Sequence, residues 1–279
     1  MKRIYTLIAL LLSVLSVSAQ GEKQLTILHT SDTHSRIEAV SPEAANRDAG
    51  KGGVVRRATY VKQVREAHPD LLLFDCGDIS QGTPYYNLFQ GEVEIKAMNL
   101  MKYDAMAVGN HEFDFGMENM ARLFRMANFP VVCANYEFAG TVLEELVKPY
   151  VVLERQGLKI GVFGLGAPLS GLVQADKCEG VVYKDPIATA QQVADKLKNE
   201  LQCDLVICLS HLGIRGGNAS DERLVAETRN IDLILGGHSH TLMQEPATYL
   251  NADGQNVKVF HSGRNGVHVG ELSLTLIEK

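Results

Sequence analysis

The chain has no surplus of positive charge and no apolar run long enough to form a stable membrane span. Its 27 lysines and arginines face 33 aspartates and glutamates, which gives a formal net charge of −6. This balance excludes the basic surface with which proteins bind nucleic-acid polymers. Apolar residues make up 46% of the 279 residues, so a folded domain with a large core is expected. Any phosphate-bearing ligand would have to be attracted by local charge, such as metal ions or a few arginines.

The N-terminal apolar segment is shorter than the roughly 20 residues that a membrane helix needs. Lys2 and Arg3 precede it, and the small residues of Ser16–Ala19 follow it. This arrangement predicts a secretory signal peptide over residues 1–19 and a mature domain over residues 20–279. We therefore expect a periplasmic or secreted protein without stable membrane insertion. An uncleaved membrane anchor is the alternative.

Cysteine is scarce and odd in number, which excludes complete pairing within one chain. Of the five cysteines, Cys76, Cys133 and Cys208 lie in apolar runs typical of strands, where a free thiol packs as a small hydrophobic group. Cys178 and Cys203 have more polar neighbours and are the better candidates for a bridge. The sequence does not predict a disulfide, although an exported protein would meet oxidising conditions.

Internal repeats, low-complexity tracts and interdomain linkers are also absent, and what remains is an alternation of strands and helices typical of an α/β fold. The predicted strands are Leu25–His29, Leu71–Asp75, Ala105–Val108, Val131–Ala134, Lys159–Gly164, Leu205–Leu209, Ile231–Leu235, Val257–His261 and Val267–Leu276. The predicted helices are Val54–His68, Val93–Met101, Met117–Asn128, Pro186–Leu201 and Asp221–Arg229. Polar, glycine-containing loops at 41–53 and 167–181 are candidate rims of a site.

Residue types that bind metals follow five of these strands. The candidate ligands are Asp32, His34, Asp78, Asn110, His211, His238 and His240. Because ligands in α/β sheets bind beyond the carboxyl ends of the strands, these loops are expected to converge. Two pairs, Asp32 with His34 and His238 with His240, are spaced so that both members point the same way in an extended chain.

The number of candidate ligands favours two metal ions. Seven side chains exceed what one tetrahedral ion accepts, whereas a shared carboxylate would let two ions take about four each. Nitrogen and oxygen ligands suit divalent Zn, Mn or similar ions. Two such ions would also provide the local positive charge that the acidic chain otherwise lacks.

The motifs Asp-x-His, Gly-Asp, Gly-Asn-His-Glu, His and Gly-His-x-His resemble those of the calcineurin-like metallophosphoesterase superfamily. Residues 30–34 and 109–114 are similar to the 5′-nucleotidase/UDP-sugar hydrolase branch. The resemblance implies a four-layered α/β/β/α sandwich. It also implies one metal held by Asp32, His34, Asp78 and His240, and a second held by Asp78, Asn110, His211 and His238.

The same resemblance implies that His111 and Asp114 form a catalytic dyad. Asp114 would orient the imidazole, and His111 would stabilise the phosphoryl group or protonate the leaving oxygen while a metal-activated hydroxide attacks phosphorus. Asp114 as a residue that only begins a helix is the structural alternative. Some phosphodiesterase relatives carry asparagine there, so the aspartate favours a nucleotidase.

The expected function is an exported phosphohydrolase of the 5′-nucleotidase type that acts on nucleotide phosphate esters. A phosphodiesterase acting on 2′,3′-cyclic or nonspecific substrates, and a metal-binding subunit, are the alternatives. Enzymes of this branch continue into a C-terminal domain that grips the nucleotide, and the chain ends at Lys279 without a counterpart. We therefore expect a separately encoded specificity domain as a possible partner.

Overall fold

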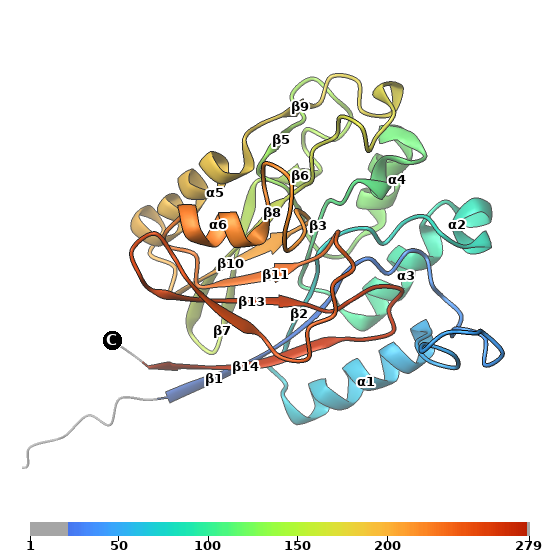
Figure 1. Cartoon of the computed structure of the whole chain (residues 1–279), viewed down its shortest axis with the longest axis horizontal. Coiled ribbons are helices and arrows are strands. Elements are labelled where there is room, and N and C mark those ends of the chain that lie inside the picture. Colours follow the sequence, from blue (N-terminus) through green and yellow to red (C-terminus); the bar gives the residue numbers. More distant parts are fainter. Residues whose placement is uncertain (1–21, 278–279) are drawn as a thin grey trace, which may run out of the picture.

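Two six-stranded sheets form the centre of the molecule. The computed structural model describes residues 22–277, so the predicted signal peptide lies outside the described residues. The first sheet contains, in spatial order, β14 (Gly270–Ile277), β1 (Glu22–Thr30), β2 (Leu72–Asp75), β3 (Ala105–Ala107), β4 (Val131–Val132) and β6 (Val147–Lys148). The second contains β12 (Ala247–Leu250), β13 (Asn256–His261), β11 (Leu233–Gly236), β10 (Leu205–Ser210), β8 (Leu158–Leu165) and β7 (Tyr150–Arg155) (Figure 1). A small antiparallel pair joins β5 (Tyr136–Glu137) to β9 (Val182–Tyr183).

Both sheets are parallel in their interior and antiparallel at an edge. In the first, β1 pairs in parallel with β2 and antiparallel with β14. In the second, β8, β10, β11 and β13 run parallel, while β7 and β12 are antiparallel edge strands. The residues of β2, β10 and β11 are all buried, as their continuous apolar sequences predict for strands covered on both faces.

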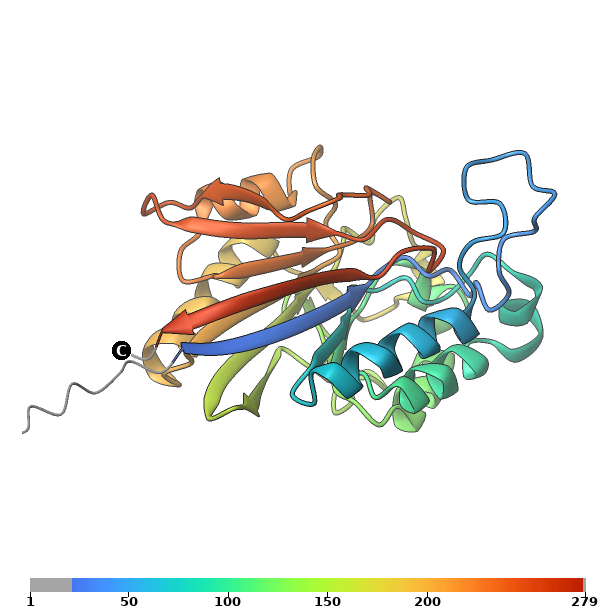
Figure 2. The same cartoon turned by 90° about the horizontal axis from the view of Figure 1, so that it is seen from below.

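Helices cover the outer face of each sheet, as Figure 2 shows. The helices on the side of the first sheet are α1 (Val54–Ala67), α2 (Pro84–Phe89), α3 (Glu92–Met101) and α4 (Gly116–Met126). On the side of the second sheet lie α5 (Pro186–Asp195), continued by a π-helical turn (Lys196–Glu200), and α6 (Asp221–Glu227). Each of these two interfaces has its own apolar core.

A third apolar core lies between the two sheets and makes the fold a four-layered α/β/β/α sandwich, as expected. Ile27 of β1 and Phe74 of β2 meet Ile207 of β10 there. Leu28, the next residue along β1, points instead toward the helices, because successive strand residues face opposite sides. The sheets approach closely at Gly164, where an added Cβ would overlap the carbonyl oxygen of Val132.

The structure corrects several predicted elements. The last strand begins at Gly270 rather than Val267, because the paired register ends at His29 and Gly270. The predicted helix Pro186–Leu201 is an α-helix only to Asp195. The strands β5, β6, β7, β9 and β12 and the helix α2 were not predicted. β7 was missed because its hairpin turn to β8 uses Gln156–Gly157, both at positive φ, in place of a more typical Asn-Gly.

All five cysteines are free in the structure, and Cys178 and Cys203 form no bridge. Between residues 22 and 277, none of the helices combines the length and the apolar composition that a membrane crossing requires.

Candidate dinuclear metal centre

The predicted ligands lie at the carboxyl ends of strands from both sheets. Asp32, Asp78 and Asn110 follow β1, β2 and β3 of the first sheet. His211 follows β10, and His238 and His240 follow β11 of the second sheet. Six of them form two groups: Asp32, His34 and His240, and Asp78, His211 and His238. Within each group the candidate ligand atoms all lie within 4.8 Å of one another.

In the first group, hydrogen bonding selects the nitrogen that faces the centre. His34 Nδ1 lies 3.2 Å from the carbonyl oxygen of Ser80, which can only accept a hydrogen bond. The neutral ring therefore carries its proton on Nδ1 and presents a lone pair on Nε2. That atom lies 2.9 Å from Nε2 of His240, which is in turn 3.5 Å from a carboxylate oxygen of Asp32.

The second group repeats this arrangement. His211 Nδ1 lies 2.7 Å from the carbonyl oxygen of Cys76, so a neutral His211 would direct its Nε2 lone pair toward Asp78. Nε2 is 3.0 Å from Asp78 Oδ2. Two electron-pair donors this close repel each other unless a proton or a cation lies near both. The donor set is therefore suited to a divalent cation.

Asn110 provides an independent test of this fit. Its side chain is 4% exposed, yet its Oδ1 has no hydrogen-bond partner among the described residues. A buried acceptor without a partner costs about 1–3 kcal/mol, so such groups are rare without a reason. Coordination of a metal ion by Oδ1 would satisfy it.

The backbone at these positions is strained. Five of the candidate ligands are non-glycine residues with φ between 46° and 68°: Asp32, His34, Asp78, His238 and His240. Hydrogen bonds between loops hold this conformation, including Asp32 N–H to the Gly77 carbonyl (2.9 Å) and His34 N–H to the Asp78 carbonyl (3.0 Å). Strain of this kind persists only where the surroundings impose it, and it concentrates at functional sites.

Glu112 was not among the predicted site residues, although the structure makes it an organiser of the site. Its buried carboxylate accepts hydrogen bonds from the backbone N–H groups of Asp78 (2.9 Å), Ile79 (3.0 Å), Ser80 (3.3 Å) and Gly109 (2.6 Å). It thereby ties the loop after β2 to the loop after β3. Its sequence signal was its place as the last residue of the Gly-Asn-His-Glu motif.

The predicted pair His111 and Asp114 is in contact at the edge of the site. His111 Nδ1 lies 3.0 Å from Asp114 Oδ2, and each side chain is about one third exposed, at 31% and 34%. The hydrogen bond that His111 donates to the Asp114 carboxylate raises the pKa of His111, while partial burial opposes the rise. The rings of His111 and His34 lie nearly at right angles, with ring centroids 5.5 Å apart, so His111 adjoins the metal-ligand candidates.

Burial and mutual charge shift the pKa values of the clustered groups in opposite directions. Burial, reinforced by Asp78, raises the pKa of Asp32 to about 7. Burial also lowers the pKa values of His238 and His240 to about 4 each, which keeps them neutral and able to ligate. At His211 burial acts to lower the pKa, but Asp78 outweighs it and raises the value to about 10. Asp32 and Asp78 are both buried, and two buried carboxylates side by side are costly unless positive charge lies nearby.

A polar cavity of about 250 Å³ opens beside His240 and adds arginines that the sequence reasoning did not single out. Arg36, Arg47 and Arg264 line it. The guanidinium of Arg264 lies 3.2 Å from His240 Nδ1. Positive side chains therefore stand next to the candidate metal centre, although the whole chain is acidic.

Known proteins share both the sequence and the fold. Residues 25–242 match the calcineurin-like phosphoesterase family. The chain is 33% identical to the snake venom 5′-nucleotidase of Crotalus adamanteus over 96% of its length, and 33% identical to the 5′-nucleotidase of Homo sapiens over 94%. Its fold matches a 5′-nucleotidase precursor from Thermus thermophilus with a TM-score of 0.82 and 30% identity, covering 91% of this chain and 54% of that one.

The chain spans about half the length of the curated relatives it matches, namely 47% of the Crotalus adamanteus protein and 48% of the human one. Residues 25–242 of this chain, which the family matches, contain the strands and loops that carry the clustered histidines and carboxylates. The family match covers most of the described residues and agrees with the four-layered fold. The chain belongs to the calcineurin-like phosphoesterase family.

Proposed function

We propose that this chain hydrolyses phosphate esters of nucleotides, as a 5′-nucleotidase-like enzyme that uses two divalent metal ions. The observation that carries the proposal is the convergence of histidine ring nitrogens and carboxylate oxygens in two neighbouring groups. The similarity to proteins named 5′-nucleotidase supports this reaction class.

Each group would hold one metal ion. Asp32, His34 and His240 would bind the first, and His211, His238 and Asn110 would bind the second, with Asp78 shared between them. When bound, two divalent ions supply positive charge for the phosphoryl oxygens and lower the pKa of water to near neutrality. The backbone N–H of His111 donates to Asp78 Oδ1 (2.8 Å), which holds the shared carboxylate in place.

His111 would act on the substrate rather than on a metal. Asp114 holds the ring through Nδ1, which leaves Nε2 to face the phosphoryl group or the leaving oxygen. A histidine whose pKa is raised keeps a proton to higher pH, so it can stabilise negative charge there or donate that proton to the departing alkoxide.

The choice among phosphate esters tests the proposal directly. The protein is loaded with Mn or Zn and offered 5′-AMP, 3′-AMP, UDP-glucose, a 2′,3′-cyclic nucleotide and a bis-aryl phosphate. We expect 5′-AMP to be turned over with the highest kcat/KM. Preference for the cyclic nucleotide or the bis-aryl phosphate would instead assign a phosphodiesterase. If the protein binds metal but hydrolyses none of these compounds, the proposed phosphohydrolase activity is refuted.

Selection of the nucleoside would need contacts beyond the metal centre. The remaining half of the curated relatives lies outside their match to this chain. We propose that a region of that kind supplies those contacts. If it does, adding it lowers KM for 5′-AMP more than KM for a simple aryl phosphate.

Export through the signal peptide at residues 1–19 is part of the same proposal. Lys2 and Arg3 ahead of an apolar run support it. Mass spectrometry of the protein recovered from the medium or periplasm is expected to give a chain that begins at Gln20. A retained Met1 would indicate an uncleaved anchor.

A further inference from the structure

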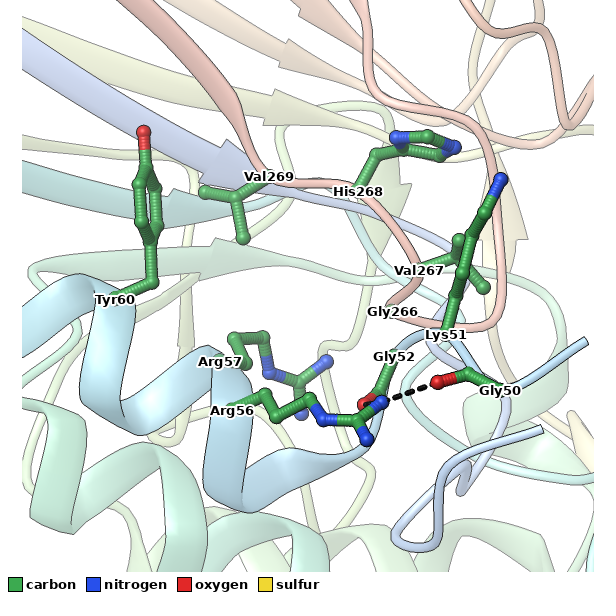
Figure 3. A pocket seen from close by; sticks show the side chains of 10 residues that line it. All are labelled: Gly50, Lys51, Gly52, Arg56, Arg57, Tyr60, Gly266, Val267, His268 and Val269. Atoms are coloured by element: carbon green, nitrogen blue, oxygen red, sulfur yellow. Dashed lines mark hydrogen bonds between the residues drawn. The ribbon is translucent and has the colours of Figure 1, made fainter. Parts of the chain in front are cut away.

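A cavity of about 440 Å³ lies between the start of α1 and the loop that precedes β14 (Figure 3). Its lining residues come from three segments: Gly50, Lys51 and Gly52; Arg56, Arg57 and Tyr60; and Gly266, Val267, His268 and Val269. None of the candidate metal ligands lines it. Its volume falls within the range of roughly 300–1,000 Å³ that is usual for small-molecule sites.

Arg57 is the distinctive residue of this cavity. Its side chain is only 8% exposed, and its Nε is buried without a hydrogen-bond partner. Within residues 22–277, its guanidinium has no hydrogen bond or ion pair. The charge of Arg57 acts on Asp75 electrostatically and lowers its pKa, against the larger effect of burial. The carboxylate oxygens of Asp75, however, already accept hydrogen bonds from the Thr30 hydroxyl (2.6 Å) and the Gly77 N–H (2.9 Å). A buried cation without a bonded partner is costly and points to a missing anion.

The residues that line the cavity around Arg57 include further positive side chains and no aspartate or glutamate. Figure 3 shows the Arg56 and Arg57 guanidiniums side by side, with Lys51 extending along the opposite wall toward His268. Arg56 donates to the carbonyl oxygen of Gly50, while the Lys51 ammonium has no partner among the described residues. Three cations thus share one cavity in a protein of net charge −6.

The N-terminus of α1 adds to the positive potential in this cavity. The helix has 14 residues, begins after Gly53 without a capping side chain, and carries no acidic residue in its first turn. Val54 N–H donates to the Ile37 carbonyl (2.8 Å), and the positive end of the helix dipole favours an anion. Gly266, at φ 57°, covers the guanidinium, and a Cβ there would overlap Nη1 of Arg57.

Figure 3 shows an apolar side opposite these cations, formed by the Tyr60 ring and Val269. Arginine forks and a helix start recognise phosphate, and an aromatic ring packs against an organic group. We propose that this cavity is a second binding site, separate from the metal centre, that takes a small organic phosphate. Its phosphate lies against Arg57, Arg56 and Lys51, and its organic part lies against Tyr60.

Equilibrium dialysis of the metal-loaded protein against radiolabelled inorganic phosphate tests the site by stoichiometry. We expect Arg57→Gln to bind one phosphate fewer per chain than the unchanged protein, however many phosphate ions the unchanged protein binds in total. Lys51→Gln, at an exposed position, is expected to weaken this site about tenfold, because a charged hydrogen bond contributes on that order. Lys62→Gln removes the same charge elsewhere on α1 and is expected to bind normally.

Equal stoichiometry in the unchanged protein and Arg57→Gln would overturn the proposal. If Arg57→Gln fails to fold by circular dichroism, the comparison of Lys51→Gln with Lys62→Gln decides in its place, and equal affinities refute the site. Because the readout is a difference in bound phosphate, it stands whether or not the metal centre hydrolyses nucleotides.

The organic part of the ligand is tested with phenylphosphonate, which has no ester bond to hydrolyse. Tyr60→Ala is expected to weaken phenylphosphonate severalfold at this site and to leave inorganic phosphate unaffected. Unchanged phenylphosphonate binding would refute the aromatic contact.

Discussion

Backbone carbonyl groups decide which nitrogen two of the buried histidines present. The carbonyls of Ser80 and Cys76 face Nδ1 of His34 and His211, respectively, so that Nε2 of each ring is directed to the centre. Such partners raise the basicity of a ligating histidine and fix its tautomer. These two carbonyls belong to the loop after β2, which also carries Asp78. One loop therefore positions three of the candidate ligands.

Replacing His111 by asparagine tests its proposed role on the substrate. We expect kcat for 5′-AMP to fall by about 10²–10⁴, as is typical for loss of a general acid. The metal content measured by atomic absorption should stay at that of the unchanged protein, because His111 belongs to neither ligand group. A parallel loss of metal would assign His111 to the metal instead.

Asp114→Asn tests the pKa of His111. The carboxylate of Asp114 raises that pKa, so its removal lowers it. If protonated His111 is the active form, activity is lost as pH rises through its pKa, and the alkaline limb of the kcat profile should move to lower pH in Asp114→Asn. An unmoved limb in a folded, metal-loaded variant would mean that His111 does not act as an acid.

Glu112→Gln is expected to loosen the loop that carries Asp78. The neutral amide is a weaker acceptor for the four N–H groups that the carboxylate now holds. Changes next to metal ligands typically reduce metal affinity or activity about 10–100-fold. Titration with a competing chelator measures the affinity, and Glu118→Gln on α4 is the control. An affinity equal to that of the control would rule out this organising role.

At the scale of elements, the site depends on two sheets whose strand ends meet. β1, β2 and β3 direct their carboxyl ends to the same region as β10 and β11, and Asp32 on one side accepts a hydrogen bond from the His238 N–H on the other (3.0 Å). Each ligand group combines residues from both sheets, so the separation of the sheets sets the distances within each group. Small residues permit this approach, most clearly Gly164 on β8.

Gly164→Ala is expected to push the sheets apart. Its Cβ would overlap the backbone of Val132, which cannot move without displacing β4. We expect the free energy of unfolding to fall by about 1–3 kcal/mol or more, as for overpacked cores. Urea unfolding measures it. Gly161→Ala on the same strand is the control, because the atoms nearest to its Cβ belong to the Leu197 side chain rather than to backbone, and an equal loss there would contradict the argument.

At the scale of the molecule, metal binding should stabilise the fold. Ions that bind only the folded state add about 2.7 kcal/mol when their concentration is 100 times Kd. We therefore expect a chelator to lower Tm and added Mn or Zn to restore it. Asp78→Asn, which lacks the shared carboxylate, should show a much smaller difference between the two conditions. An unchanged Tm of the unmodified protein upon chelation would argue against both metal sites.

Acid should destabilise the fold through His29. Burial, with a smaller effect of His261, lowers the pKa of His29 from 6.5 to about 3. The folded state thus keeps His29 neutral while the unfolded chain takes up a proton below pH 6.5. Stability is full above that pH and declines as pH falls toward 3, by about 1.4 kcal/mol per unit.

His29→Phe removes this titration and also two buried nitrogens that have no partner. In urea unfolding with chelator present, we expect the loss of stability between pH 6.5 and 4.5 to be smaller by roughly 2–3 kcal/mol in His29→Phe. His68→Gln, at the end of α1, is the control and should keep the full acid slope. Parallel slopes in all three proteins would refute the assignment to His29.

Part of the fold and of the candidate site could be predicted from the sequence. The apolar runs of β2, β10 and β11 predicted strands covered on both faces, and metal-binding residue types directly after them predicted loops that meet. The unpredicted β7 and β12 are edge strands, for which half-buried sequences give a weaker pattern. Glu112 and Arg57 were missed as site residues because neither sequence position reveals that a charged side chain is buried.

The amino-acid sequence by itself determined which side chains follow which strands. It therefore determined which metal-binding residue types could meet at the strand ends. That information is local, since strand periodicity and the residue after a strand depend on neighbours in sequence. Only the tertiary structure decided that Ser80 and Cys76 orient the histidines, that Glu112 ties two loops, and that Arg57 lies buried without a partner beside Gly266. These are contacts between segments far apart in the chain, and they depend on burial and distance, which no short stretch of sequence specifies.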